Sequence, residues 1–464
     1  MKHFSILFIA LQFIAQSITA QSTTVSGTVA AFDKDFMLFR YRDRLDTLWV
    51  NENGGFSIKM NIERGEECRV INGKQIIKLY VVPGDNLVVN FDASNAKDLG
   101  AFTGKSSAAC QYYPSAAQSD AALNKHVHIK VLGTKSPAQV MKTLDSVRVV
   151  REQNLSSFVN ANKLDQEFLN YMKEVIAYQC MTEGAVYRKN SENYQSEAFT
   201  TQRPEFEQYL RTLPLDNPRV LYSEIYQNYV RTLLAGDVLE KMEVKSPEDL
   251  PAFYYTTMQL AAGQLKTQEV RNYILKEIMV EAMKESGTRD ITGCMELLEQ
   301  ENDNEPMKER VRKIWRQYEA IQPGSVCPPI EQYTSDGEVV TMSHFAGKVV
   351  YIDVWATWCG PCKKEIPHLK TLEEKYHGKN IEFVSISTDQ DVNKWKEFIA
   401  TESMSGLQLH QSDEAEKTIS RYFVINSIPR FILIDESGKI VSADAPRPSS
   451  GQTLYGLIDS VLND

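Results

Sequence analysis

The residues in this chain with the clearest chemical potential are two cysteines three positions apart, Cys359 and Cys362, in the run "WCGPC". Two thiols at this spacing can bind part of a zinc site, close a small structural disulfide, or exchange electrons with another thiol pair. Four further cysteines are widely separated and show no pairing pattern, so we interpret them as small buried apolar residues: Cys68, Cys110, Cys180 and Cys294. Cys327 stands nearest to the pair, and we expect a structural role for it, with a regulatory or third redox cysteine as the alternative.

A zinc site and a structural disulfide both fit the pair poorly. A structural zinc site needs four ligands, but the chain has no second C-x-x-C, and His368 would lie on the same helix as Cys362. We therefore predict no metal. A disulfide that closes so small a loop restricts the unfolded chain very little. Electron exchange is the chemistry that the pattern favours.

The elements around the pair supply what thiol exchange requires. The apolar run "VVYIDVWA" predicts a buried strand, and helical character begins directly after Cys359. A helix N-terminus stabilises a thiolate through its free N–H groups and its partial positive charge. Gly360 and Pro361 suit the first helical turn, where no backbone N–H is needed. We expect Cys359 to be the exposed attacking thiol and Cys362 the buried resolving thiol.

The region from residue 319 to 464 has the pattern of an α/β domain. Apolar strand-like runs alternate with helical segments, which predicts a largely parallel sheet covered on both faces. The run "RFILIDESGKIVSA" predicts two strands joined by a turn at residues 436–438. The Pro- and Gly-containing run "AIQPGSVCPP", residues 320–329, predicts a hinge before this domain.

Two other domains are expected upstream. Residues 21–112 show short β-rich runs separated by turns, including Asn53-Gly54-Gly55 as a hairpin turn, and predict an all-β, sandwich-like domain. A Ser/Ala-rich stretch, residues 104–123, predicts a loose boundary. Residues 113–318 show apolar residues at helical spacing and predict a helical domain, whose stripes we interpret as core rather than as a cofactor pocket. The fold class is thus multidomain.

The N-terminus and the charge limit location and partners. Residues 1–20 combine Lys2, an apolar stretch and a small residue at Ala20, which together predict a cleaved secretory signal. No cysteine stands directly after that cleavage point, so we expect no lipid attachment there, and no later stretch is long and apolar enough to span a bilayer. We expect an exported protein of a bacterial periplasm or cell envelope that is not integral to the membrane. A net charge of −10 without basic clusters argues against nucleic acid as a partner.

The motif "DVWATWCGPC", followed by "KKEIPHL" and later by "SIPRFILIDESGKIV", resembles the thioredoxin superfamily, and within it the exported TlpA/ResA-like thiol–disulfide oxidoreductases. The resemblance implies a buried acid at Asp353 that accepts a proton from Cys362. It also implies that Glu365 is an acid that shifts the pKa of either thiol, although a solvated surface charge is the alternative for this residue. Pro367 matches a helix kink, whose role is shape.

The same resemblance implies a cis-proline loop at Ile428-Pro429, where substrate backbone pairs beside Cys359. The expected substrate contacts are Trp358, Gly360, Pro361, Ile428 and Pro429. Arg430 replaces the threonine that commonly follows this proline, so the resemblance does not extend to client specificity. Trp355 is expected in the core.

Three functions fit these sequence features. The favoured one is an exported reductase of protein disulfides, which forms a Cys359–Cys362 disulfide and needs no cofactor. The resemblance implies that it receives electrons from a membrane electron-delivery partner. Apocytochrome c or misoxidised exported proteins are the expected clients. A thiol-dependent peroxide reductase fits less well, because Val354 occupies the position of the proline in that pattern and Thr357 is displaced by one residue. The third is an envelope binding or recruiting protein with an accessory redox module.

Overall fold

The computed structural model describes residues 20–32, 36–73, 75–95, 97–288, 290–389, 391–402, 404–411, 418–425 and 427–462. The chain forms two compact units. The first comprises Met1–Lys241 and Gly263–Ile274, and the second comprises Met242–Ala262 and Leu275–Asp464. The predicted signal segment, apart from Ala20, lies outside the described residues.

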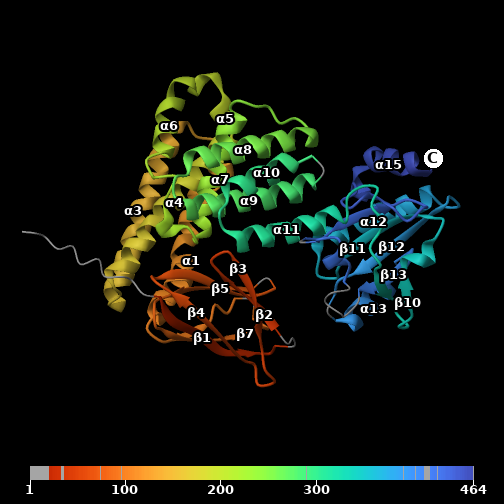
Figure 1. The fold of residues 1–464 in the computed structure, drawn as a ribbon, viewed down its shortest axis with the longest axis horizontal. Coiled ribbons are helices and arrows are strands. Elements are labelled where there is room, and N and C mark those ends of the chain that lie inside the picture. The colour runs from red at the N-terminus through yellow and green to blue at the C-terminus, as the bar shows by residue number, and fades with distance from the viewer. Residues whose placement is uncertain are drawn as a thin grey trace, which may run out of the picture. The chain divides into compact units, whose positions relative to one another are not determined.

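The β-rich part of the first unit is a pair of four-stranded sheets, with strand orders β4-β1-β7-β8 and β3-β2-β5-β6 (Figure 1). Their inward-facing residues form one apolar core that includes Val25, Phe39 and Leu79, as the alternation within the strands requires. This confirms the sandwich-like prediction. The strands are β1 Gln21–Ala30, β2 Phe36–Tyr41, β3 Arg44–Trp49, β4 Gly55–Ile62, β5 Glu66–Asn72, β6 Gln75–Val81, β7 Asn86–Asp92 and β8 Ala101–Thr103.

The expected turn near Asn53 is present, but it does not close a regular hairpin. Gly54 has a φ of +75° and its N–H donates to the carbonyl oxygen of Asn51. The strands on either side, β3 and β4, belong to different sheets and share only the single bridge Val50–Phe56 among the described residues. The turn therefore carries the chain from one sheet to the other, which sequence alternation alone does not distinguish from a hairpin.

The helical part of the first unit begins inside the stretch that we expected to be a loose boundary. Helix α1 spans Ser107–Val127 and thus occupies most of residues 104–123. The reason is packing: Cys110 is fully buried in the sandwich core, and the ring of Tyr112 lies edge-on to those of Phe158 and Phe168. The other helices of this unit are α2 Ile129–Leu132, α3 Pro137–Asn162, α4 Gln166–Asn190, α5 Glu192–Gln195, η1 Glu197–Gln202, α6 Arg203–Leu210, η2 Pro218–Val220 and α7 Glu224–Leu239.

The start of α3 follows the predicted capping pattern. The Ser136 side chain accepts a hydrogen bond from the N–H of Gln139, whose own side chain accepts one from the N–H of Ser136. The apolar stripe of this helix, which includes Val140, Leu144 and Val147, is buried. This confirms its interpretation as core. Four helices and one 3-10 turn follow before the α/β region: η3 Pro247–Asp249, α8 Leu250–Gln264, α9 Gln268–Ser286, α10 Thr292–Glu301 and α11 Glu305–Glu319.

The C-terminal domain is built on a seven-stranded sheet of order β10-β9-β13-β12-β11-β14-β15 (Figure 1). Apolar clusters cover both of its faces, as predicted. Its elements are β9 Glu331–Tyr333, β10 Val339–Thr341, η4 Met342–Phe345, β11 Val349–Trp355, α12 Gly360–Lys375, β12 Ile381–Ser387, α13 Val392–Thr401, β13 Leu407–Gln411, α14 Ile419–Tyr422, β14 Arg430–Ile434, β15 Ile440–Ser442, η6 Pro448–Ser450 and α15 Gln452–Leu462.

The expectation of a largely parallel sheet is wrong. Strand β12 pairs in parallel with β11 and with β13, whereas the other neighbouring pairs are antiparallel. Short connections explain two of these antiparallel pairs, since β9 and β10, and likewise β14 and β15, follow each other too closely for a crossover. The sheet is therefore mixed, with its parallel strands at the centre.

The run predicted as a hinge, residues 320–329, lies along strand β15. The N–H groups of Gly324 and Cys327 donate to the carbonyl oxygens of Ile440 and Gly438, respectively. In the other direction, the N–H of Ile440 donates to the carbonyl oxygen of Ser325. The side chain of Cys327 is buried in the core of this domain. A segment bonded in this way is not a free hinge.

The structure shows no helix, within the ranges it describes, that is long and apolar enough to cross a membrane.

Candidate active site

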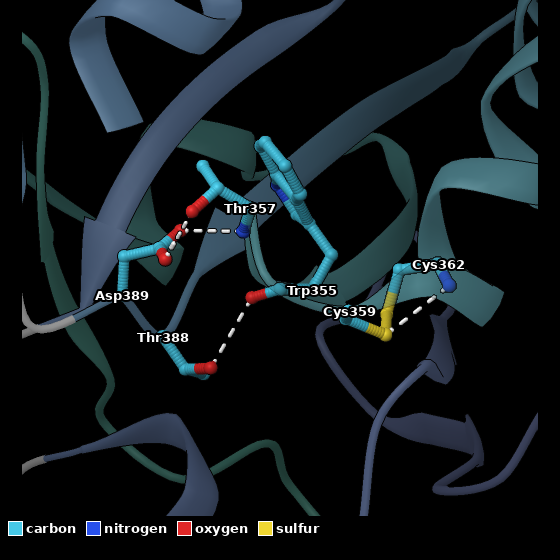
Figure 2. The surroundings of a disulfide bond; sticks show 6 residues. All are labelled: Trp355, Thr357, Cys359, Cys362, Thr388 and Asp389. Atoms are coloured by element: carbon cyan, nitrogen blue, oxygen red, sulfur yellow. Dashed lines mark hydrogen bonds between the residues drawn. A yellow bond between two sulfur atoms is a disulfide. The ribbon is translucent and has the colours of Figure 1, made fainter. Parts of the chain in front are cut away.

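The two cysteines of the C-x-x-C motif form a disulfide at the start of α12, with a Cα–Cα distance of 5.2 Å (Figure 2). Strand β11 ends at Trp355, and Cys359 is the N-cap residue of α12. The Cys359 Sγ atom accepts a hydrogen bond of 3.1 Å from the N–H of Cys362. The attacking sulfur expected from the sequence thus lies where a helix N-terminus directs an N–H group at it.

The disulfide is less accessible than we expected. Cys359 is 4% exposed and Cys362 is 3% exposed, so the prediction of an exposed Cys359 is wrong for this form. Both belong to an apolar cluster with Trp355, Ala356 and Trp395, and this packing covers the sulfur atoms. In contrast, Trp358 is 55% exposed, and Gly360 and Pro361 are also exposed. The surface beside the disulfide is therefore formed by residues 358, 360 and 361.

The loop between β11 and Cys359 is bonded to the end of β12, as Figure 2 shows. The Asp389 carboxylate accepts hydrogen bonds from the N–H and the hydroxyl of Thr357, at 2.8 and 2.7 Å. The N–H of Thr388 donates to the carbonyl oxygen of Trp355 at 2.8 Å. Sequence reasoning missed Asp389, although an acid two residues after a central strand points to the edge of the sheet where α/β sites lie.

The proline loop lies against the same cluster. The Ile428–Pro429 peptide bond is cis, and Ile428 packs against the cluster that holds Cys359 and Cys362. Strand β14 begins at Arg430, which pairs with Val354 at the end of β11. The Arg430 side chain lies 3.2 Å from the Asp444 carboxylate. The fold thus brings residues 428–430 to the disulfide, about 70 residues along the chain from it.

Asp353 is a buried acid on the central strand. It is 6% exposed and pairs with Ser385 of β12 and Phe431 of β14. Burial is the main cause that raises its pKa to about 8, and the charges of Glu365 and Glu373 add to the effect. The carboxyl therefore keeps its proton at pH values well above those at which an aspartate ordinarily ionises. This suits a group that takes up and returns a proton near neutral pH.

Glu365 is also buried, which excludes the alternative of a solvated surface charge. It lies one helical turn after Cys362 and is 8% exposed. Its two carboxylate oxygens accept hydrogen bonds from the hydroxyl and the N–H of Ser449, at 2.9 and 3.0 Å. Its charge acts on Asp353. The two acids therefore lie close enough for the charge of Glu365 to raise the pKa of Asp353.

The remaining cysteines are free and buried: Cys68, Cys110, Cys180, Cys294 and Cys327. Burial raises the pKa of the Cys327 thiol to about 12. Such a thiol is protonated at neutral pH and is a poor nucleophile, which favours the structural role for Cys327. His368 is exposed on α12, and no group of three or more His, Cys, Asp or Glu side chains in the described ranges is arranged to hold a metal ion.

Comparisons with known proteins match this chain in its C-terminal domain. The Redoxin family profile matches residues 322–453. The thiol-disulfide oxidoreductases ResA of Bacillus thuringiensis (strain Al Hakam) and of Bacillus anthracis are each 32% identical over 124 residues, which covers 26% of this chain and 69% of the relative. The solved thioredoxin domain of a thiol-disulfide oxidoreductase from Bacteroides vulgatus is 30% identical, with a TM-score of 0.28, and the match covers 31% of this chain and 99% of that one.

The matched region contains the disulfide, the proline loop and both buried acids, and it has the mixed sheet described above. Through this C-terminal domain, the chain belongs to the ResA-like thiol–disulfide oxidoreductases.

Proposed function

We propose that this protein is an exported reductase of protein disulfides that works through Cys359 and Cys362. The observation that carries the proposal is the Cys359–Cys362 disulfide at the N-terminus of α12, with Ile428 of the cis-proline loop packed against its cluster. A helix N-terminus favours a thiolate on Cys359 in the reduced protein. The exposed Trp358 beside it offers an apolar surface for a client chain.

The proposed reaction has two exchange steps. The Cys359 thiolate attacks one sulfur of a client disulfide, which forms a mixed disulfide and releases one client thiolate. The Cys362 thiol then loses its proton to Asp353, and its thiolate attacks Cys359. This releases the second client thiolate and leaves Cys359–Cys362 oxidised. The client gains two electrons, and the enzyme loses two.

The physiological direction also needs a source of electrons. The Gly-Pro pair between the cysteines resembles that of reducing family members, which favours reduction over oxidation. Outside the cytosol, the enzyme disulfide then has to be reduced again, and we propose a membrane electron-delivery protein for that step. In this step Cys362 is the leaving group, and a protonated Asp353 supplies its proton. Apocytochrome c is among the proposed clients.

A trapping experiment tests the proposal. In the Cys362→Ser variant the mixed disulfide cannot resolve, so clients should accumulate on Cys359 and be identified by mass spectrometry after nonreducing separation. The Cys359→Ser/Cys362→Ser double variant is the control and should trap nothing. Disulfide turnover should vanish in Cys359→Ser and persist in Cys327→Ser. If native expression yields no disulfide-linked partner, the claim of protein clients fails. A cellular phenotype that survives Cys359→Ser would favour the recruiting function instead.

A further inference from the structure

We propose that Asp389 is a positioning residue for the redox pair, which holds the loop that presents Cys359 at the start of α12. The inference rests on the proposed function. Neither the C-x-x-C motif nor the proline loop contains this residue, and it lies 30 positions after Cys359 in the sequence. The geometry in Figure 2 points to it because its carboxylate holds Thr357 in the loop, and the neighbouring Thr388 holds Trp355 at the end of β11.

The Asp389 carboxylate is fully engaged in this task. It is 4% exposed, and one oxygen accepts the Thr357 hydroxyl at 2.7 Å. The other oxygen accepts the N–H of Thr357 and the hydroxyl of Ser387, both at 2.8 Å. Three donors around one buried side chain suit a carboxylate, which only accepts, better than an amide, whose nitrogen only donates.

The backbone of Asp389 is held as firmly as its side chain. Its N–H donates to the Ser387 hydroxyl at 3.0 Å. Its carbonyl oxygen lies 2.6 Å from Nε2 of His410, a buried residue of β13. Thr388 adds both its N–H and its hydroxyl to the carbonyl oxygen of Trp355. The anchor therefore connects the loop before Cys359 to two central strands of the sheet.

The link from this anchor to the sulfur is short. Thr357 stands two residues before Cys359, and the N–H of Cys359 closes a turn onto the carbonyl oxygen of Ala356 at 3.0 Å. Without a carboxylate that accepts both the N–H and the hydroxyl of Thr357, the turn gains freedom, and the Cys359 sulfur no longer meets the N–H of Cys362 in one geometry. Thiol exchange needs an aligned attack, and a misplacement of about 1 Å can cost roughly a hundredfold in rate.

The test uses reduced full-length protein, a small disulfide probe such as oxidised glutathione, and iodoacetamide. Stopped-flow measurements give the rate of thiol–disulfide exchange. The rate of alkylation of Cys359, measured as a function of pH, gives the pKa of its thiol. For Asp389→Asn we expect a loss of about ten- to a hundredfold in exchange rate and an alkylation midpoint at higher pH. Thr357→Val should show a smaller loss, and Thr357→Ser, which keeps the hydroxyl, should restore the wild-type rate. Adding Thr357→Val to Asp389→Asn should cost little more, because both changes break the same contact.

Asp391→Asn is the matched control. Asp391 lies two residues further along, is exposed, and caps α13 through the N–H groups of Asn393 and Lys394. Its amide variant should lower the melting temperature without moving the alkylation midpoint. The inference is overturned if Asp389→Asn keeps the wild-type rate and midpoint, or if Asp391→Asn loses as much. An exchange activity that is absent in the wild type, or that survives Cys359→Ser, would instead overturn the proposed function.

Discussion

At the scale of single residues, the pKa of Asp353 gives the clearest expected dependence on pH. The pKa is raised to about 8 in the fold, above the ordinary value of 3.8 for an aspartate. Between these two pH values the unfolded chain has lost this proton and the folded chain still holds it. The contribution of Asp353 to the free energy of unfolding therefore falls as pH rises from about 4 to about 8. Above about pH 8 it does not fall further.

The substitution Asp353→Asn removes this titration. We expect its free energy of unfolding to exceed that of the oxidised wild type by an amount that grows across the same pH window, on the order of 5 kcal/mol at its upper end. Urea denaturation at several pH values measures the difference. Glu365→Gln should move the upper end of the window to lower pH, because the Glu365 charge helps to raise the pKa of Asp353. Glu374→Gln, at an exposed position of the same helix, is the control. A stability difference that is independent of pH would contradict the assignment.

At the scale of elements, the contact between Glu365 and Ser449 fastens α12 to the 3-10 turn η6. The contact joins residues that are 84 positions apart, and it is largely shielded from water on the side of Glu365. Hydrogen bonds to charged groups contribute more than neutral ones, at about 1.5–3 kcal/mol. This pair therefore contributes to the position of the helix that carries Cys362, as well as to the environment of Asp353.

The substitution Ser449→Ala should remove the hydroxyl bond and leave the backbone N–H bond to Glu365. We expect a loss of about 1–2 kcal/mol in the free energy of unfolding, measured by urea denaturation of the oxidised protein. Ser450→Ala changes the same type of residue at the next exposed position and should stay within about 0.5 kcal/mol of the wild type. Equal effects of the two changes would argue that the Glu365 contact does not stabilise the domain.

At the scale of the whole molecule, the proposed reductase can meet exported clients only if the chain itself is exported. We expect native expression in a bacterium to yield a mature chain that begins at Gln21, because residues 1–20 have the composition of a cleaved signal. Mass spectrometry of the N-terminal peptide measures this. A chain that lacks residues 2–20 should remain in the cytoplasm, where its Cys359–Cys362 pair is reduced. Recovery of a periplasmic protein that still carries Met1 would contradict the prediction.

Much of the redox centre could be inferred from the sequence because its main parts are local. The strand, the C-x-x-C motif and the helix start lie within residues 349–375, and helix capping and strand burial are properties of short windows. The cis-proline loop is distant in sequence, and it was identified through the family resemblance. The sandwich-like and helical regions likewise follow from the spacing of apolar residues, a pattern that survives without knowledge of strand order.

Tertiary structure alone decided the features that depend on contacts between distant residues. The mixed direction of the sheet depends on which strands become neighbours, and the attachment of residues 324–327 to β15 depends on a free strand edge. Likewise, Cys359 is buried in a cluster that includes the distant Trp395, and the anchors Asp389–Thr357 and Ser449–Glu365 join residues that are 32 and 84 positions apart. Sequence patterns report the local preferences of the backbone and the faces that will be buried, whereas the partner of a buried polar side chain is known only once the chain has folded around it.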